Sequence, residues 1–572
     1  MEKTYFEELK AVEFKNVGFE IADAIRGTVS ENNFLPTIVS AAYILRELNE
    51  ENTKSTLEET LSLIELNADI KDVLMRYLSF VWEDIKSLVM KYSVDELTAL
   101  VLYLDIYSAK RGYDDTTPVG ISKLACRILD IKDDDKVLDL CSGKSGFGVE
   151  LFGYNPNVKY TGVELNYTLK DIAILRMSLL SKDAKIVLND ALDYDVDCSA
   201  DKLFSNYPFA LRIDSNNPFK ENILKKYGIK NEKRVSSDWL FNLALISNMK
   251  DNGKAVAIMS NGSTWNILDK NIRKFFIENG FIEAVISLPS KLFNDTGIPT
   301  TMIVFSKNNK NVRMIDASNI CVSERRNNVI TDSNIDEIVE LLNKDSDISI
   351  VNILEDFEKN EYILNAVRYL EKAPEIENGV EFGTVIKNIT RGSQLKAKEI
   401  DEMKSESETE YKYLMISNLC NGTVSFDDNQ YLKEVPEKLE KYCIKNNSIV
   451  LTKIGVPKTK SAVVNINEGE KLLATGNIFA IEIDETKINP YFLQAFFASD
   501  IGIANFKTIY SGTVLPTISI DKLKKMIVPM PSLEIQKEIA DKYAAATDEI
   551  LLLQRKLDKV TSRMKHIFDE EG

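Results

Sequence analysis

The chain has 572 residues, of which 44% are hydrophobic and 28% are charged, and its formal net charge is −17 at pH 7. This composition excludes a disordered or collagen-like protein, and the length predicts about three domains. A single histidine, His566, and six scattered cysteines exclude a catalytic triad and argue against a protein-held metal site. Because the net charge is acidic, any DNA binding must rest on local basic surface.

Residues 1–110 are predicted to be helical, since apolar residues recur at spacings of three and four. Over residues 111–330, short apolar runs such as KVLDL and KAVAIMS alternate with helical stretches, which predicts an α/β domain with a Rossmann-like, doubly wound sheet. The last two runs, IEAVISLP and TTMIVFSK, suit an antiparallel edge pair. There is neither a run of eighteen apolar residues nor a signal-peptide pattern, so we expect a cytoplasmic protein without a membrane segment.

Residues 331–378 are predicted to form an acidic, helical connector. A β-rich pattern with turns over residues 379–532 predicts an α+β domain. Residues 533–572 are predicted to form one long helix with a heptad seam. The apolar or small residues of the seam are Tyr543, Ala546, Ile550, Leu553, Leu557, Val560, Met564 and Ile567. Such a seam needs a partner, which is either the chain's own domains or the same helix of a second copy.

A glycine-containing loop follows the first predicted strand. The strand ends at Asp139 and runs into CSGKSGFGVE, where Gly143, Gly146 and Gly148 open a helix. Glycines in this context let the backbone approach a ligand closely. Glu164, at the end of the next strand, stands where a carboxylate can bind the two ribose hydroxyls of a nucleoside cofactor.

The identity of that cofactor stays open at this point, because NAD and S-adenosylmethionine both fit the loop. Lys144 and Ser145 break the G-x-G-x-x-G spacing that a pyrophosphate usually requires. Asp190, after the third strand, can accept a hydrogen bond from an adenine amino group, or it can simply cap a helix.

A second loop, after the fourth strand, reads Asn206, Tyr207, Pro208 and Phe209. The amino group of adenine is a poor nucleophile, since its lone pair is delocalised into the ring. An asparagine oxygen and a nearby backbone carbonyl can accept its two hydrogens and aim the lone pair at an electrophilic methyl group. An aromatic ring can stack on a base extruded from the duplex. A simple β-turn is the alternative, but the position in the chain favours the catalytic interpretation.

At these loops, residues 111–320 resemble the modification subunit of type I restriction-modification systems, an adenine-N6 DNA methyltransferase. RGYDDTTPVGISKLACRIL and IRKFFIENGFIEAVISLPSKLFNDTGIPTTMIVFSK carry the resemblance further. It implies S-adenosylmethionine as the cofactor, held by Thr117, Pro118, Asp139, Gly143, Gly146, Phe147, Glu164 and Asp190. It also implies that Asn206, Tyr207 and Pro208 frame the target amine, with Phe209 stacking on the base.

Two departures from the family pattern bear on activity. Tyr207 replaces the first proline of the family's Asn-Pro-Pro-aromatic loop, which keeps the backbone carbonyl but predicts a less rigid turn. Lys144 and Ser145 replace the usual Ser and Gly, and a Cβ at Ser145 is costly if the backbone adopts a positive φ. A catalytically impaired DNA-recognition scaffold of a restriction or defence complex is therefore the alternative function. A combined nuclease-methyltransferase is disfavoured, since we find no convincing Asp…Glu-x-Lys metal site.

Residues 380–570 resemble one half of the specificity subunit of the same systems, for example over SGTVLPTISIDKLKKMIVPMPSLEIQKEIADKY. This resemblance implies a site-specific methyltransferase with its own recognition domain for double-stranded DNA. It further implies a homodimer through the C-terminal helix and leaves room for a restriction subunit. Basic residues that either contact phosphates or form a solvated face are Arg391, Lys441, Lys445, Lys453, Lys458 and Lys460.

Overall fold

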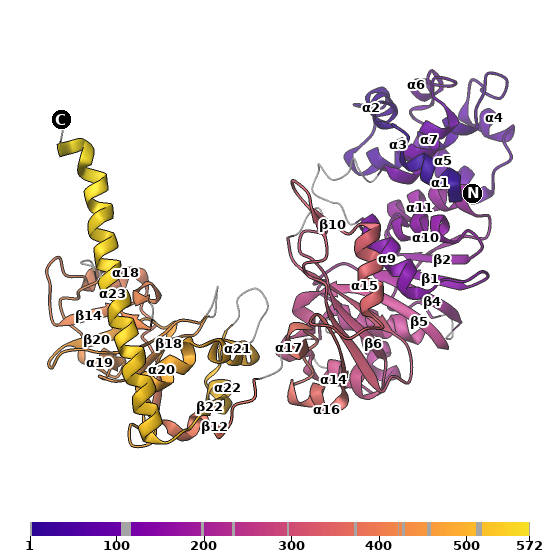
Figure 1. Ribbon diagram of the computed structural model, residues 1–572. Helices are drawn as coiled ribbons and strands as arrows, with labels where there is room; N and C mark the ends of the chain where they lie inside the picture. Colours follow the sequence, from indigo (N-terminus) through magenta and orange to yellow (C-terminus); the bar gives the residue numbers. More distant parts are fainter. Residues whose placement is uncertain are drawn as a thin grey trace. The chain divides into compact units, whose positions relative to one another are not determined.

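The computed structural model describes residues 3–104, 116–195, 199–214, 216–230, 235–293, 297–370, 374–420, 422–425, 430–454, 459–510 and 517–570. The chain divides into two compact units, Met1–Leu370 and Glu371–Gly572 (Figure 1). Within the described residues, no helix combines the length and the apolar character needed to cross a bilayer.

The first unit begins with the helices α1 (Lys3–Lys10), α2 (Lys15–Ala24), α3 (Glu31–Glu47), α4 (Leu57–Ser62), α5 (Ala68–Leu78), α6 (Trp82–Lys86) and α7 (Val94–Tyr103). The helical character predicted for this region is thus confirmed in its described part. Side chains cap the starts of α4, α5 and α7, and on α7 Ser93 and Glu96 form a capping box.

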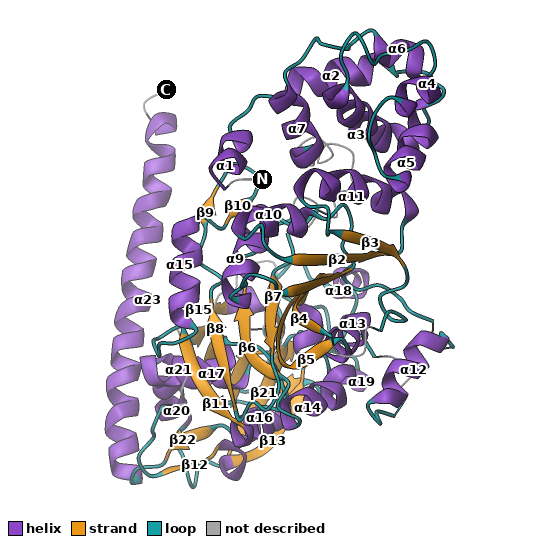
Figure 2. Ribbon diagram, turned by 90° about the vertical axis from the view of Figure 1, so that its right-hand side faces the viewer, coloured by secondary structure: helices purple, strands orange, loops and turns teal. Residues whose placement is uncertain are grey.

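A nine-stranded sheet forms the centre of the first unit (Figure 2). Its order is β11 (Ser349–Ile353), β8 (Asn311–Asp316), β6 (Ile282–Ser287), β7 (Thr300–Phe305), β5 (Met249–Ser260), β4 (Ala200–Asn206), β1 (Lys136–Leu140), β2 (Lys159–Glu164) and β3 (Lys185–Leu188). The five strands from β3 to β5 are parallel. Their carboxyl ends therefore meet at one end of the sheet, where ligands bind in folds of this class.

Helices cover both faces of this sheet and bury a separate apolar core on each. One core contains α9 (Val119–Leu129), α10 (Gly146–Tyr154), α11 (Tyr167–Leu180), α15 (Asp332–Leu341) and the N-terminal helices. The other contains α12 (Pro218–Lys226), α13 (Ser237–Ser247), α14 (Lys270–Glu278), α16 (Leu354–Lys359) and α17 (Val367–Leu370). Alternate residues of β1, such as Val137 and Leu138, enter opposite cores, as the two-residue period of a strand requires.

Two sequence predictions need correction on this side of the sheet. β6 and β7 are antiparallel, as predicted, but they are not the edge, because β6 pairs with β8 and β8 pairs with β11. The predicted connector is not purely helical either. Its segment 349–353, SIVNI, is short and rich in β-branched residues, and it forms the edge strand β11.

The second unit is built from small sheets and helices. An antiparallel sheet has the order β13 (Ile386–Arg391), β21 (Ile478–Ile483), β18 (Ile449–Thr452) and β19 (Ser461–Val463). A second sheet has the order β14 (Tyr411–Leu414), β20 (Lys471–Ala474) and β17 (Cys443–Ile444). The α+β character predicted for this region is therefore confirmed.

The long C-terminal helix α23 spans Leu533–Glu570, close to its prediction. Its first half packs on α20 (Pro490–Ala498), where Gln536 and Ala540 are buried. The Gln536 side chain accepts a hydrogen bond from the Asn489 N–H (2.8 Å) and donates one to the Pro531 carbonyl (2.9 Å). The start of the helix is thus fixed to its own unit by hydrogen bonds as well as by packing.

Candidate active site

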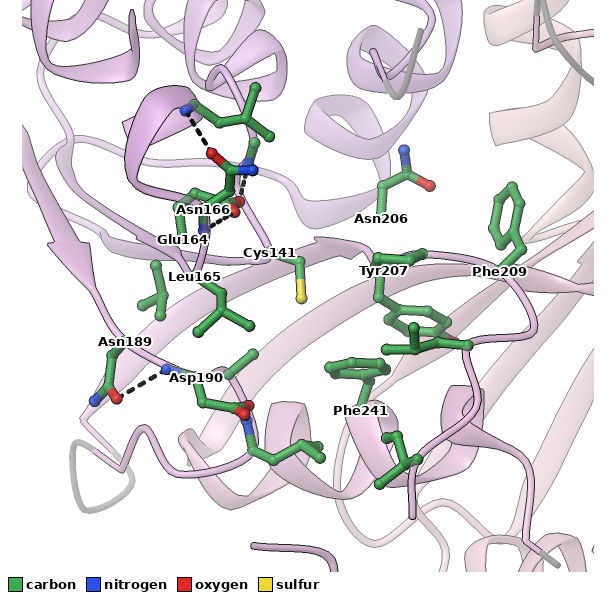
Figure 3. Close-up of a pocket in the computed structure, with 18 of the residues that line it drawn as sticks. Cys141, Glu164, Leu165, Asn166, Asn189, Asp190, Asn206, Tyr207, Phe209 and Phe241 are labelled. Atoms are coloured by element: carbon green, nitrogen blue, oxygen red, sulfur yellow. Dashed lines mark hydrogen bonds between the residues drawn. The ribbon is translucent and has the colours of Figure 1, made fainter. Parts of the chain in front are cut away.

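A cavity of about 790 Å³ opens at the carboxyl ends of β1 to β4 (Figure 3). The predicted site residues that line it are Gly143, Glu164, Asp190, Asn206, Tyr207, Pro208 and Phe209. They come from four strand ends that are adjacent in the sheet but spread over 67 positions of the sequence, from 143 to 209. The parallel topology is what brings them together.

The loop after β1 bends sharply and faces Glu164. Gly143 (φ 54°) and Ser145 (φ 56°) both adopt the left-handed conformation. A Cβ in this region costs roughly 1 kcal/mol, so the concern raised by Ser145 in the sequence is justified, although the turn still forms. The Gly143 N–H donates to Glu164 Oε2 (2.8 Å), and the Asn166 N–H donates to Oε1 (2.7 Å). The Glu164 carboxylate is therefore held in a fixed orientation at the wall of the cavity.

Asp190 lies at the wall of the cavity below Glu164 in Figure 3. Its Oδ1 accepts a hydrogen bond from the Leu192 N–H (2.9 Å), so it does stabilise the local turn. Residues 191–193 form a turn rather than a helix, so Asp190 is not the helix cap that the sequence left open. The turn contact and the cavity position coexist, because a carboxylate has lone pairs for both.

Asn206 ends β4 and has an unusual hydrogen-bonding state. Its Nδ2 donates to Thr117 Oγ1 (3.0 Å), which fixes the amide. Its Oδ1 is buried and has no hydrogen-bond partner. A buried acceptor without a donor costs about 1–3 kcal/mol, so this atom, on a residue that lines the cavity, suits a ligand that donates a hydrogen bond.

The remainder of this loop is fixed by aromatic packing. The Tyr207 ring stacks on Phe241 (centroids 5.1 Å apart, 15° between planes), and its hydroxyl donates to Asn242 Oδ1 (3.1 Å). These contacts fix the position of Tyr207 in the loop. Pro208 is exposed. Phe209 meets the Phe293 ring edge to face at 5.3 Å, and both rings line the cavity.

Two predicted cofactor contacts lie outside the cavity. Asp139 is only 1% exposed and accepts a hydrogen bond from the Tyr160 hydroxyl (2.8 Å). Phe147 is also 1% exposed and stacks on Phe204 (4.1 Å). The loop turns both side chains into the core, so neither lines the cavity here, and their cofactor contacts stay predictions. Burial raises the pKa of Asp139 to about 7, which the Tyr160 hydrogen bond opposes and nearby Glu164 reinforces.

Three further predicted contacts lie beside the cavity without lining it. Thr117 reaches the site through Asn206, and Pro118 precedes the first turn of α9. Gly146 starts α10 and faces Thr116 and Thr117, where an added Cβ would still fit at ordinary contact distance.

The sequence did not point to several residues that build the site. Leu165, Leu169, Leu192, Phe241 and Phe293 add apolar walls. Arg176 was also missed: its Nε donates to the Val101 carbonyl (2.9 Å) and its Nη1 to the Lys144 carbonyl (3.1 Å). An arginine within the apolar helix YTLKDIAILRMSLL was the available signal.

Comparison with known proteins fits this geometry. Residues 104–378 match the N-6 DNA methylase family, and residues 386–562 match the type I restriction modification DNA specificity domain. The chain is an N-6 DNA methylase domain fused to a specificity domain. The relation predicted from the sequence is thus confirmed for both parts.

Named relatives of the methylase domain are methylase subunits of type I restriction enzymes. The MjaVIII subunit of Methanocaldococcus jannaschii is 29% identical over 48% of this chain and 52% of its own length. The MpnII subunit of Mycoplasma pneumoniae is 28% identical over 41% of this chain and 48% of its own length. The chain therefore spans about half the length of these relatives. A methyltransferase subunit structure from Streptococcus thermophilus aligns with a TM-score of 0.49 and 19% identity, covering 63% of this chain and 98% of its own.

The predicted cations of the specificity domain do not form a single cluster. Arg391, Lys453 and Lys460 lie at one end of the four-stranded sheet, at or next to the ends of β13, β18 and β19. Lys445 lies at the opposite end, where it pairs with Glu482 (2.8 Å). Lys441 sits over the Tyr442 ring (5.1 Å). Lys458 lies outside the described residues.

Proposed function

We propose that this chain is a site-specific DNA adenine-N6 methyltransferase of a restriction-modification system. The observation that carries the proposal is the buried, unpartnered Oδ1 of Asn206, in the same cavity as Gly143, Glu164 and Asp190. An amide oxygen without a partner can accept a hydrogen bond from the amino group of an adenine base. The cavity also has room for a nucleoside cofactor and a base.

The residues of the cavity fit S-adenosylmethionine. The carboxylate of Glu164 is presented by two backbone N–H groups and would hold the ribose hydroxyls, while Asp190 would accept from the adenine amino group. The apolar side chains of Leu165 and Leu192 would cover the purine ring. When bound, this cofactor supplies an electrophilic methyl group on a sulfonium ion.

The catalytic work left to the protein is orientation. Asn206, held by Thr117, would accept one hydrogen of the target amine and direct the lone pair of its nitrogen. Phe209 would stack on the extruded base. Neither altered loop opposes this function, since Ser145 still forms the turn and Tyr207 is anchored by Phe241 and Asn242. The alternative of an impaired scaffold thus gains no support from the described residues of the site.

The decisive experiment measures transfer of labelled methyl groups to DNA. The wild-type protein with S-adenosylmethionine and unmodified DNA should give N6-methyladenine at one sequence motif, read by single-molecule sequencing. Asn206→Ala should lower the rate at least 100-fold, the loss typical of a missing transition-state acceptor. Its affinity for the cofactor, measured by calorimetry, should stay unchanged.

Asn248→Ala serves as the matched control, because Asn248 is a buried asparagine whose amide caps backbone carbonyls away from the cavity. Absence of any label from wild-type reactions, with added partner subunits as well as without them, would refute the proposed function.

The distal half of α23 supports a second part of the proposal, a homodimer. Exposed apolar side chains follow the heptad seam at Ile550, Leu553, Leu557, Val560 and Met564. We infer that the same helix of a second copy covers this stripe and so places two specificity domains on one DNA. Association with a restriction subunit would add cleavage to the complex.

Leu553→Lys with Leu557→Lys should convert a dimer into a monomer in analytical ultracentrifugation, because two charges enter the apolar seam. Lys556→Glu with Lys559→Glu, at exposed positions beside the seam, is the matched control and should remain dimeric. A wild-type protein that sediments as a monomer at all concentrations would contradict the inference.

A further inference from the structure

A small hairpin stands at the carboxyl end of the sheet, beyond β8. It consists of β9 (Val322–Ser323) and β10 (Asn328–Val329), paired antiparallel. The Glu324 N–H donates to the Asn327 carbonyl (2.9 Å), and Ser323 Oγ donates to Asn328 Oδ1 (2.9 Å). Arg325 and Arg326 are exposed at the tip. The two hydrogen bonds close the turn, and the turn presents two guanidinium groups to solvent.

The hairpin is attached to one wall of the cavity. The Asn328 N–H donates to the Lys291 carbonyl (2.9 Å), and Asn328 Nδ2 donates to the Ser290 carbonyl (2.9 Å). Two residues further along that loop is Phe293, which lines the cavity and contacts Phe209. The hairpin and the aromatic pair are thus held by one short segment.

On its other side the hairpin adjoins the segment that orients Asn206. Ile330 follows β10 and lies so close to Gly120 that an added Cβ there would come within 2.4 Å of the Ile330 carbonyl oxygen. Gly120 is in the first turn of α9, three residues after Thr117. Figure 2 shows the hairpin beside α9 and α15. The base of the hairpin is consequently joined to two segments that flank the cavity, the loop before Phe293 and the start of α9.

The residues that line the cavity carry more negative than positive charge. The charged residues that line it are Glu164, Asp190 and Asp214, against a single cation, Arg212. A polyanionic ligand is repelled by this set and by the net charge of −17. Among the described residues, no carboxylate forms an ion pair with Arg325 or Arg326. Arginine suits phosphate oxygens better than other side chains, because its planar donors bind them in pairs.

We propose that Arg325 and Arg326, at the hairpin tip, bind the phosphate backbone of the DNA strand that contains the target base. This inference rests on the proposed function, since it presupposes a DNA substrate. The contact carries no sequence information, so it complements base reading by the specificity domain. The exposed side chain of Lys291 adds a third cation on the loop to which the hairpin is hydrogen-bonded.

Fluorescence anisotropy with a labelled 40-base-pair duplex of random sequence tests the contact, in the presence of S-adenosylmethionine and over a series of salt concentrations. Each lost phosphate contact lowers the slope of log K against log salt by about 0.9. Arg325→Ala with Arg326→Ala should therefore reduce the slope by about 1.8 and weaken binding roughly tenfold at low salt. Arg325→Lys with Arg326→Lys should keep most of the slope.

Lys310→Ala with Lys359→Ala is the matched control. These two lysines are exposed at the opposite, amino end of the sheet, before β8 and at the end of α16, and their removal changes the net charge equally. The control should bind as the wild type does. A slope that is unchanged in the hairpin variant, or that falls as much in the control, overturns the proposal.

A wild-type protein that binds no duplex overturns it as well. Failure of the proposed function gives a different result, namely DNA binding with the expected slopes but no methyl transfer by the wild type.

Discussion

Asp139 shows how a single buried carboxyl group couples stability to pH. Its folded-state pKa is raised to about 7, whereas an unfolded aspartate titrates near 3.9. Between these two values the folded chain keeps a proton that the unfolded chain releases. The free energy of unfolding therefore falls as pH rises from about 4 to about 7, by a few kcal/mol, and is level above that range.

Asp139→Asn should remove this dependence, because an amide does not titrate. All three tryptophans, Trp82, Trp239 and Trp265, belong to the first unit, so their fluorescence during urea unfolding reports on that unit alone. The difference in unfolding free energy between wild type and variant should change between pH 4 and pH 7. A difference that is constant with pH would show that Asp139 is ionised throughout.

At the scale of elements, Arg176 connects α11, α7 and the loop after β1. It binds the Val101 carbonyl of α7 and the Lys144 carbonyl, next to the left-handed Ser145. Arg176→Met should leave these carbonyls without that donor, destabilise the fold by roughly 2 kcal/mol and weaken S-adenosylmethionine binding about tenfold. Calorimetric titration and thermal unfolding measure the two effects separately.

Arg76→Met is the appropriate control. Arg76 joins α5 to α11 through Asp171 (2.6 Å) and lies over the Tyr167 ring (4.4 Å), and neither of these contacts involves the loop after β1. Its loss should lower stability but leave cofactor affinity unchanged. Equal losses of affinity in both variants would mean that Arg176 acts only through general stability.

These elements also show what the sequence could and could not predict. The alternation of apolar runs and helical stretches predicted the parallel strands. Because the ends of parallel strands meet, the residues at or after these ends line one cavity, namely Gly143, Glu164, Asp190 and Asn206. The position of β7 between β5 and β6 was not predictable, since strand pairing is decided by contacts distant in sequence. For the same reason the inward turn of Asp139 and Phe147 required the packing against Tyr160 and Phe204 to be known.

At the scale of the whole molecule, the two units have separate interiors. Each apolar core belongs entirely to Met1–Leu370 or to Glu371–Gly572. Residues 1–370 expressed alone should therefore fold and bind S-adenosylmethionine as the full chain does. Methylation of DNA should be lost or become unspecific, since the specificity domain is absent. Insolubility of this fragment would show that the second unit stabilises the first.

The hydrogen bond from Asn206 to Thr117 joins residues 89 positions apart. The group that faces the substrate is therefore aligned by a piece of chain other than the strand that carries it. A ligand at the Glu164 and Asp190 end of the cavity does not by itself align Asn206, because that alignment depends on the Thr117 hydroxyl. Ligand binding in the cavity and the alignment of Asn206 are thus separate properties of the protein. A contact that displaces Thr117, just before α9, would change the alignment without changing the binding.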